Sequence, residues 1–180
     1  MYRLALLALV GAAACATSST VGDRRDVTTI SVGGSSGGTL RVRNETESAS
    51  GIIALPVAKV WSALPAVFDS LGMTPTTVDP TKRLFGTEGA KLRQRIGGIA
   101  LSRFFDCGTT QVGPNADSYE VLIMAYVQLK TAPANTTTIE VTVNARARPV
   151  AFRQGYSDCQ PQTRTLDAHI IELVRRQANR

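Results

Sequence analysis

Histidine and cysteine are scarce in this chain of 180 residues, which has one histidine and three cysteines. It also lacks the H-E-x-x-H and C-x-x-C motifs. Zinc, haem and di-iron sites usually draw on several such ligands, so these metal sites are not expected. His169 lies beside the apolar face of a predicted helix, which favours a packed or surface position over a catalytic base.

Nucleotide-binding glycine motifs are absent as well. The chain has no P-loop and no strand-linked G-x-G-x-x-G, so a nucleotide phosphate has no evident cradle. We therefore expect no metal, no other cofactor and no enzymatic activity. Two carboxylates that meet only in the folded protein leave no sequence pattern, so an enzyme is kept as the third alternative.

The composition is that of one globular domain. Hydrophobic residues make up 43% of the chain and charged residues 19%, a balance that disordered chains do not have. The formal net charge is +6, of which Arg3 contributes one unit. If a leader that contains Arg3 as its one charged residue is removed, the remaining chain still has a net positive charge.

The first 14 residues have the layout of a secretory signal. A positive charge at Arg3 precedes an apolar run over residues 4–10, and small residues follow at 11–14. The run is too short for a permanent membrane span. We expect residues 1–14 to be a signal peptide and the protein to be exported.

Cys15 follows three alanines, and this arrangement resembles the lipobox of bacterial lipoproteins. In those proteins the thiol is alkylated by diacylglycerol, and cleavage makes the cysteine the new N-terminus. Ala12 stands where the lipobox usually has leucine, so ordinary cleavage and a soluble periplasmic or secreted protein is the alternative. The resemblance implies that Ala16 directs the protein to the outer membrane, facing the periplasm. Residues 15–25 would be the lipidated cysteine and a tether.

Lipidation of Cys15 would leave Cys107 and Cys159 as an even pair. In an oxidising compartment such a pair is expected to form a disulfide. The bond would close a loop of roughly fifty residues and stabilise the fold by about 4 kcal/mol in the chain-entropy model. Two inert buried thiols are the alternative.

Residues 26–180 are predicted to form a single domain that begins with short strands. Thr, Val and Ile enrichment with near-alternation predicts strands at 27–32 and 40–43; a further strand is expected to begin in the polar residues 44–50 and run to 55, and short strands are expected at 73–79 and 83–87. The first two would form a hairpin, and the G-x-S-x-G between them is expected to be a loop because no helix follows it. Residues 90–107 give no clear assignment, and 108–117 are expected to be a loop.

Two segments with apolar residues at three- and four-residue steps predict helices. The first covers residues 56–71 and is expected to be kinked or interrupted at Pro65. The second covers residues 163–177, with Thr163 or Thr165 as its cap and two arginines in its last turn.

Two long alternating segments, residues 118–130 and 136–148, predict paired strands joined by a turn at 131–135. Each has one apolar face, and the opposite face of the first carries Leu122, Met124 and Tyr126. Antiparallel strands with one-sided alternation usually pack helices on that side. We expect an α+β fold in which a long helix and a C-terminal helix pack on one face of an antiparallel sheet, the helix-grip arrangement.

Cations are concentrated in two of these segments. They are Lys91, Arg93, Arg95 and Arg103 in the unassigned segment, and Arg146 and Arg148 in the last long strand. Together with Leu122, Met124 and Tyr126 they are the candidate contacts for a protein partner or for phosphate-bearing lipid headgroups. A solvated rim of charges is the alternative, and export argues against nucleic acid.

Part of the chain resembles BamC-like (NlpB-type) lipoproteins. The resemblance is carried by Val60-Trp61, by Gly72-Met73 and by Val78-Asp79-Pro80-Thr81-Lys82. Those lipoproteins belong to the outer-membrane β-barrel assembly machinery and contain helix-grip domains. They carry two such domains and a long N-terminal partner-binding segment, so their partner contacts are not transferred to any residue here.

An anchored, disulfide-bonded α+β domain without a catalytic set indicates a non-enzymatic lipoprotein that acts through contacts with an envelope protein, and the resemblance implies that it does so in envelope biogenesis. A Val-Trp pair in the first helix also occurs in START-like ligand-binding domains of the same fold. The alternative is therefore a carrier that holds a small apolar ligand or a lipid between the sheet and the C-terminal helix.

Overall fold

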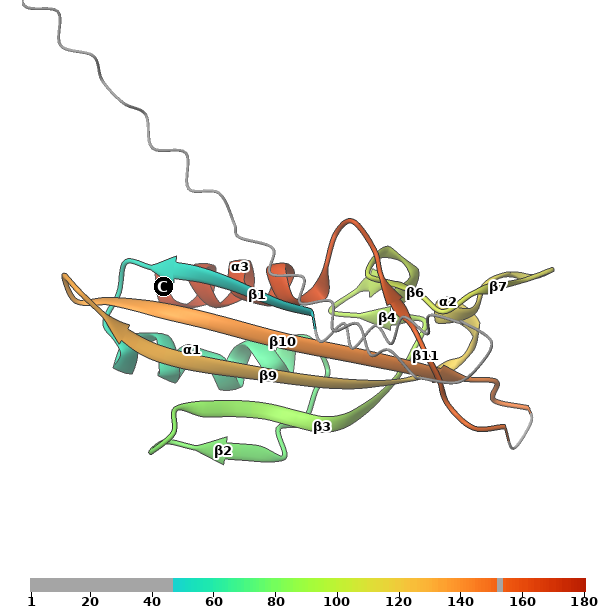
Figure 1. Ribbon diagram of the computed structural model, residues 1–180, viewed down its shortest axis with the longest axis horizontal. Helices are drawn as coiled ribbons and strands as arrows, with labels where there is room; N and C mark the ends of the chain where they lie inside the picture. Colours follow the sequence, from blue (N-terminus) through green and yellow to red (C-terminus); the bar gives the residue numbers. More distant parts are fainter. Residues whose placement is uncertain (1–46, 152–153) are drawn as a thin grey trace, which may run out of the picture.

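The computed structural model describes residues 47–151 and 154–180 (Figure 1). The predicted signal peptide, Cys15, the tether and the predicted hairpin at 27–43 lie outside these residues. In the part of the chain that is described, no helix is both long and apolar enough to cross a membrane.

One antiparallel sheet dominates the described structure, with strands in the order β1-β10-β9-β3-β2 and with β11 paired to the end of β10. Its strands are β1 (Glu47–Ile53), β2 (Thr77–Asp79), β3 (Leu84–Arg93), β9 (Glu120–Ala132), β10 (Thr136–Arg148) and β11 (Ser157–Asp158). β9 and β10 pair along their whole length, as the two alternating segments predict.

Helices α1 (Val57–Ser70) and α3 (Leu166–Ala178) lie side by side on one face of this sheet (Figure 1). α3 packs on β1 and β10, and α1 packs on β9 and β10. The predicted α+β fold, with both helices on one face of an antiparallel sheet, is confirmed. Thr165 occupies the N-cap position of α3 without a side-chain cap; the Asp167 carboxylate accepts the backbone N–H of Ala168 instead.

Of the kink or interruption expected at Pro65, the interruption is wrong, because α1 continues through this residue. Pro65 is exposed, so the helical hydrogen bond that it cannot make is lost on the solvent side of α1. Water can replace a hydrogen bond there, and the cost of the proline is therefore small enough for packing of the apolar face to overcome.

The core fills the space between the helices and the sheet. Its fully buried side chains include Val60, Leu64 and Phe68 of α1, Ile139 and Val141 of β10, and Ile170 and Val174 of α3. The Phe68 ring meets the edge of Phe85 with their centroids 5.0 Å apart. The inward residues predicted for the two long strands, from Val121 to Leu129 and from Ile139 to Ala147, are buried as expected.

Short elements build a second cluster, the end lobe, at one end of the sheet. They are β4 (Arg95–Ile96), β5 (Ile99–Ala100), a 3-10 turn (Leu101–Arg103), β6 (Phe105–Asp106), β7 (Thr109–Thr110), β8 (Gly113–Pro114), α2 (Asn115–Ser118) and β12 (Gln160–Pro161). The expectation that 108–117 is only a loop is wrong, because it contains the β7–β8 hairpin and most of α2. Gly97 and Gly98 make the turn between β4 and β5 with φ of 54° and 81°, which glycine adopts without strain.

A disulfide between Cys107 and Cys159 joins the end lobe to the connection between β10 and α3. The two Cα atoms are 4.3 Å apart and the cysteines are 52 residues apart in sequence. β12 pairs with β6 next to this bond, and the Cys159 N–H donates to the Ala145 carbonyl of β10. The predicted pairing is confirmed, and the alternative of two separate thiols is wrong.

Candidate functional site

The side of the sheet that faces away from α1 and α3, called the outer face here, carries most of the candidate residues. Alternation along β9 turns Leu122, Met124 and Tyr126 to this face, where all three are half-buried. We call these three residues the apolar stripe. The Tyr126 ring lies across Gly86 of β3. A Cβ atom at position 86 would lie 2.5 Å from Tyr126 Cδ1, so this position of the ring requires glycine.

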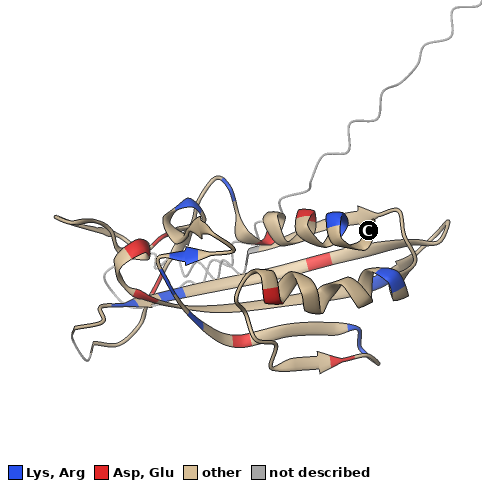
Figure 2. Cartoon of the chain, turned by 180° about the vertical axis from the view of Figure 1, so that it is seen from behind, with Lys and Arg blue, Asp and Glu red and all other residues tan. Residues whose placement is uncertain are grey.

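The strand register places four of the candidate cations in two adjacent rows on the outer face. One row runs across Arg93, Glu120 and Arg148, and the next across Lys91, Leu122 and Arg146. We call Lys91, Arg93, Arg146 and Arg148 the basic end. In Figure 2, blue segments of β3 and β10 lie near one another at the end of the sheet far from the C-terminus.

The other two candidate cations are not part of this group. Arg95 in β4 and Arg103 in the 3-10 turn belong to the end lobe, outside the main sheet. The Arg95 guanidinium donates to the Gly98 carbonyl at 2.8 Å and so supports the tight turn between β4 and β5. The structure thus divides a cluster that looked continuous in the sequence.

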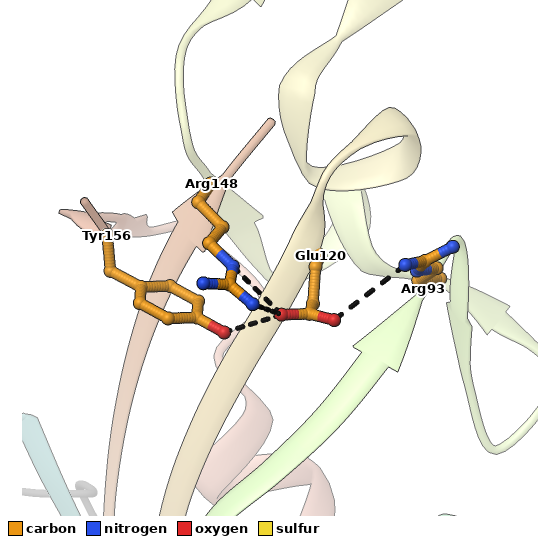
Figure 3. Close-up of polar contacts among 4 residues, drawn as sticks. All are labelled: Arg93, Glu120, Arg148 and Tyr156. Atoms are coloured by element: carbon orange, nitrogen blue, oxygen red, sulfur yellow. Dashed lines mark hydrogen bonds and ion pairs between the residues drawn. The ribbon is translucent and has the colours of Figure 1, made fainter. Parts of the chain in front are cut away.

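Glu120 is the centre of the polar contacts at the basic end (Figure 3). Its Oε1 accepts hydrogen bonds from Arg148 Nε at 3.0 Å, from Arg148 Nη2 at 2.8 Å and from the Tyr156 hydroxyl at 2.6 Å. Its Oε2 lies 3.7 Å from Arg93 Nη2, and the Arg148 guanidinium stacks over the Tyr156 ring at 4.6 Å. One carboxylate therefore links β3, β9, β10 and the segment that follows β10.

The protonation states of this cluster follow from its hydrogen bonds. The hydrogen bond from Tyr156, with those from Arg148, holds the pKa of Glu120 below its ordinary value of 4.5, although burial acts in the opposite direction. Burial and the hydrogen bond to Glu120 both raise the pKa of Tyr156 above its ordinary value of 10.0. At neutral pH these shifted pKa values keep Glu120 ionised and Tyr156 neutral, so the hydroxyl remains the donor and the carboxylate the acceptor.

Replacement of Glu120 by glutamine is expected to destabilise the fold by about 1–2 kcal/mol at about pH 7, because charged hydrogen bonds are lost. The lowered pKa means that ionised Glu120 stabilises the fold above pH 4.5 and that this contribution disappears as the pH falls through the folded-state pKa. The difference between wild type and Glu120→Gln should therefore shrink at about pH 3. Urea unfolding followed by the fluorescence of Trp61, the one tryptophan, measures it.

Glu140→Gln is the matched control for that experiment. Glu140 also lies on the outer face, where it pairs with Lys130 at 3.2 Å, but both side chains are exposed. Its replacement should cost less than about 0.5 kcal/mol. A destabilisation by Glu120→Gln that is the same at both pH values would contradict the arrangement in Figure 3.

Two hollows accompany these residues on the surface. A depression of about 570 Å³ is lined by Arg93, Glu120 and Arg148 together with residues that follow β10. A shallower hollow of about 310 Å³ lies over Tyr126, between Leu84 of β3 and Thr142 of β10. The outer face therefore offers concave surface beside both the basic end and the apolar stripe.

His169 has the packed position expected for it. Its ring lies against Phe104 with the centroids 5.3 Å apart, and its Nδ1 is 3.5 Å from Arg164 Nη2. Burial and the nearby Arg164 and Arg176 lower the pKa of His169 below 6.5. Within residues 47–151 and 154–180, no three His, Cys, Asp or Glu side chains come together as metal ligands would.

Sequence reasoning missed Glu120 and Tyr156. Glu120 is an outward residue at the start of β9, and Tyr156 lies outside every predicted element. Only the register, which sets Glu120 between Arg93 and Arg148, identifies the carboxylate as the link between two predicted cations. Comparison of the sequence with protein-family models and with curated proteins finds no match.

Proposed function

We propose that this protein is an exported, non-enzymatic lipoprotein that acts through protein–protein contacts. In this proposal, Cys15 carries the lipid anchor, the protein is attached to the outer membrane facing the periplasm, and its partner is an envelope protein. The resemblance to BamC-like lipoproteins supports a role in envelope biogenesis. The disulfide supports export, because such bonds persist mainly outside the reducing cytoplasm.

The observation that carries the proposed mode of action is the apolar stripe on the outer face. Its three side chains lie on the side of the sheet opposite α1 and α3 and are half-buried. Apolar surface with a charged border is a common feature of protein-binding sites, and the basic end supplies that border. The hollow over Tyr126 provides a place for a side chain of the partner.

The filled interior favours this proposal over a ligand carrier. Ile170 and Val174 of α3 are fully buried in the same cluster as Ile139 and Val141 of β10. A START-like carrier would need space between the sheet and the C-terminal helix for an apolar ligand. These side chains occupy that space, and a ligand would have to displace them.

A photo-crosslinking experiment in intact membranes tests the proposal. A photoreactive amino acid in place of Met124 should give a discrete protein adduct, because this position is central in the apolar stripe. The same amino acid in place of Ser62, an exposed residue of α1 on the opposite side, is the matched control and should give none. Tyr126→Glu added to the Met124 variant should abolish the adduct, since a charge would enter the hollow.

Equal crosslinking from both positions, or an adduct that survives Tyr126→Glu, would show that the outer face is not the contact surface. A purified protein that carries a bound apolar molecule, detected by native mass spectrometry, would favour the carrier instead.

A further inference from the structure

The basic end has more positive charge than its neighbours neutralise. The side chains of Arg93 and Arg146 are 58% and 46% exposed, and Lys91 is exposed as well. Two carboxylates oppose the four cations: Glu120 contacts Arg148 and Arg93, and Asp158 pairs with Arg146 at 3.0 Å. Among the described residues Lys91 has no ion pair within 4.0 Å, so the described part of the chain leaves a net positive charge at this end of the outer face.

The chain that leads to Cys15 enters the sheet near this same end. β1 begins at Glu47, which lies opposite Val143 of β10. Arg146 is three residues further along β10, about 10 Å away at the usual rise of a strand. Glu47 follows Cys15 by 32 residues, so an anchor at Cys15 would attach the domain to the membrane through the end of β1 that lies near the basic end.

We infer that the basic end binds the anionic headgroups of phospholipids, so that the domain lies against the membrane that its anchor enters. This inference rests on the proposed lipid anchor. It assigns different binding partners to the basic end and to the apolar stripe. The cations contact the membrane, and Met124 and Tyr126, the part of the apolar stripe beyond the row that contains Leu122, remain available to the protein partner. Each cation held near an anionic surface strengthens binding about fivefold.

Vesicle binding by the chain without its leader and without lipid tests this inference. The protein starts at residue 15 and carries Cys15→Ser, so that neither the signal peptide nor acyl chains contribute. Sedimentation with phosphatidylcholine vesicles is compared with sedimentation with mixed phosphatidylcholine–phosphatidylglycerol vesicles. The test variant is Lys91→Gln, Arg93→Gln, Arg146→Gln. The matched control is Lys59→Gln, Arg176→Gln, Arg180→Gln, which removes three exposed cations from the helices and the C-terminus.

We expect wild type to bind only the vesicles that contain phosphatidylglycerol, and to be released by high salt. The basic-end variant should bind at least about tenfold more weakly, and the control should change less than about twofold. Thermal unfolding checks that both variants remain folded. Equal losses in the two variants, or no preference for the anionic lipid, would overturn the inference.

The outcome is separable from that of the proposed function. If the basic-end variant binds vesicles normally but loses the Met124 adduct in membranes, the cations bind an acidic protein and the membrane inference is wrong. If vesicle binding behaves as expected but no adduct forms, membrane docking is supported and the protein-contact function fails.

Discussion

Phe68→Ala is expected to lower the free energy of unfolding by about 3–5 kcal/mol. The Phe68 side chain is fully buried, and its ring meets the edge of Phe85 at 5.0 Å between α1 and the sheet. Its removal would leave a cavity that the paired strands β3 and β9 have little freedom to fill. Urea unfolding of the variant and of wild type, followed by circular dichroism, gives the difference.

Val112→Ala serves as the control for this substitution. Val112 is 87% exposed in the β7–β8 hairpin, so its truncation should cost less than about 0.5 kcal/mol. A loss below about 1 kcal/mol for Phe68→Ala would mean that α1 does not pack on the sheet as described.

Loss of the disulfide is the second large expected effect. Replacement of Cys107 and Cys159 by serine should destabilise the protein by about 4 kcal/mol, because the bond closes a loop between cysteines 52 residues apart. The end lobe should be affected most, since without the bond its part before β9 contacts the segment before α3 mainly through the β6–β12 pair, a few hydrogen bonds and the stacking of Arg164 over Phe104. Thermal unfolding with hydrogen exchange of the end-lobe amides measures both effects.

Reducing agent provides the internal control for the disulfide. Wild type treated with dithiothreitol should unfold like the double variant, and the double variant itself should not respond to the reagent. If the unfolding temperature of the wild-type protein is the same with and without dithiothreitol, the bond does not contribute as described.

The parts of the fold that the sequence predicts are those with a long, regular pattern. Burial alternates over the first ten residues of β9 and over all thirteen of β10, and the predicted inward residues from Val121 to Leu129 and from Ile139 to Ala147 are buried, with Thr137 buried in addition. The apolar spacing of α1 likewise outweighed the proline within it, because burial of its apolar face offsets the cost of about 3 kcal/mol that a proline has inside a helix. In a long periodic segment many residues support the same assignment, so one residue that does not fit the pattern changes the prediction little.

The end lobe could not be predicted because nothing in it is periodic. Its strands have two residues each, and a register shift between Thr87 and Ala90 separates the regular part of β3 from the part that leads to the lobe. The contacts that stabilise it are between residues distant in sequence, such as the pair Cys107 and Cys159 and the hydrogen bonds from Ser102 to Asp117.

The candidate surface was predicted in part, for a related reason. The outward direction of Leu122, Met124 and Tyr126 follows from alternation within one strand. The grouping of Lys91 and Arg93 with Arg146 and Arg148 depends on the pairing of three strands, as does the place of Glu120 between them. Register is a property of the folded sheet, so the sequence indicated the residues but not their neighbours.

The intact mass of the protein extracted from the membranes of its own cells tests the account most directly. We predict a chain that starts at Cys15, carries the mass of a diacylglyceryl group and an amide-linked acyl chain, and is two hydrogens lighter than its reduced form. Cys15→Ser should be recovered without acyl chains. A wild-type protein that retains residues 1–14, or that starts near residue 15 with no added lipid and fractionates as soluble, would contradict the account.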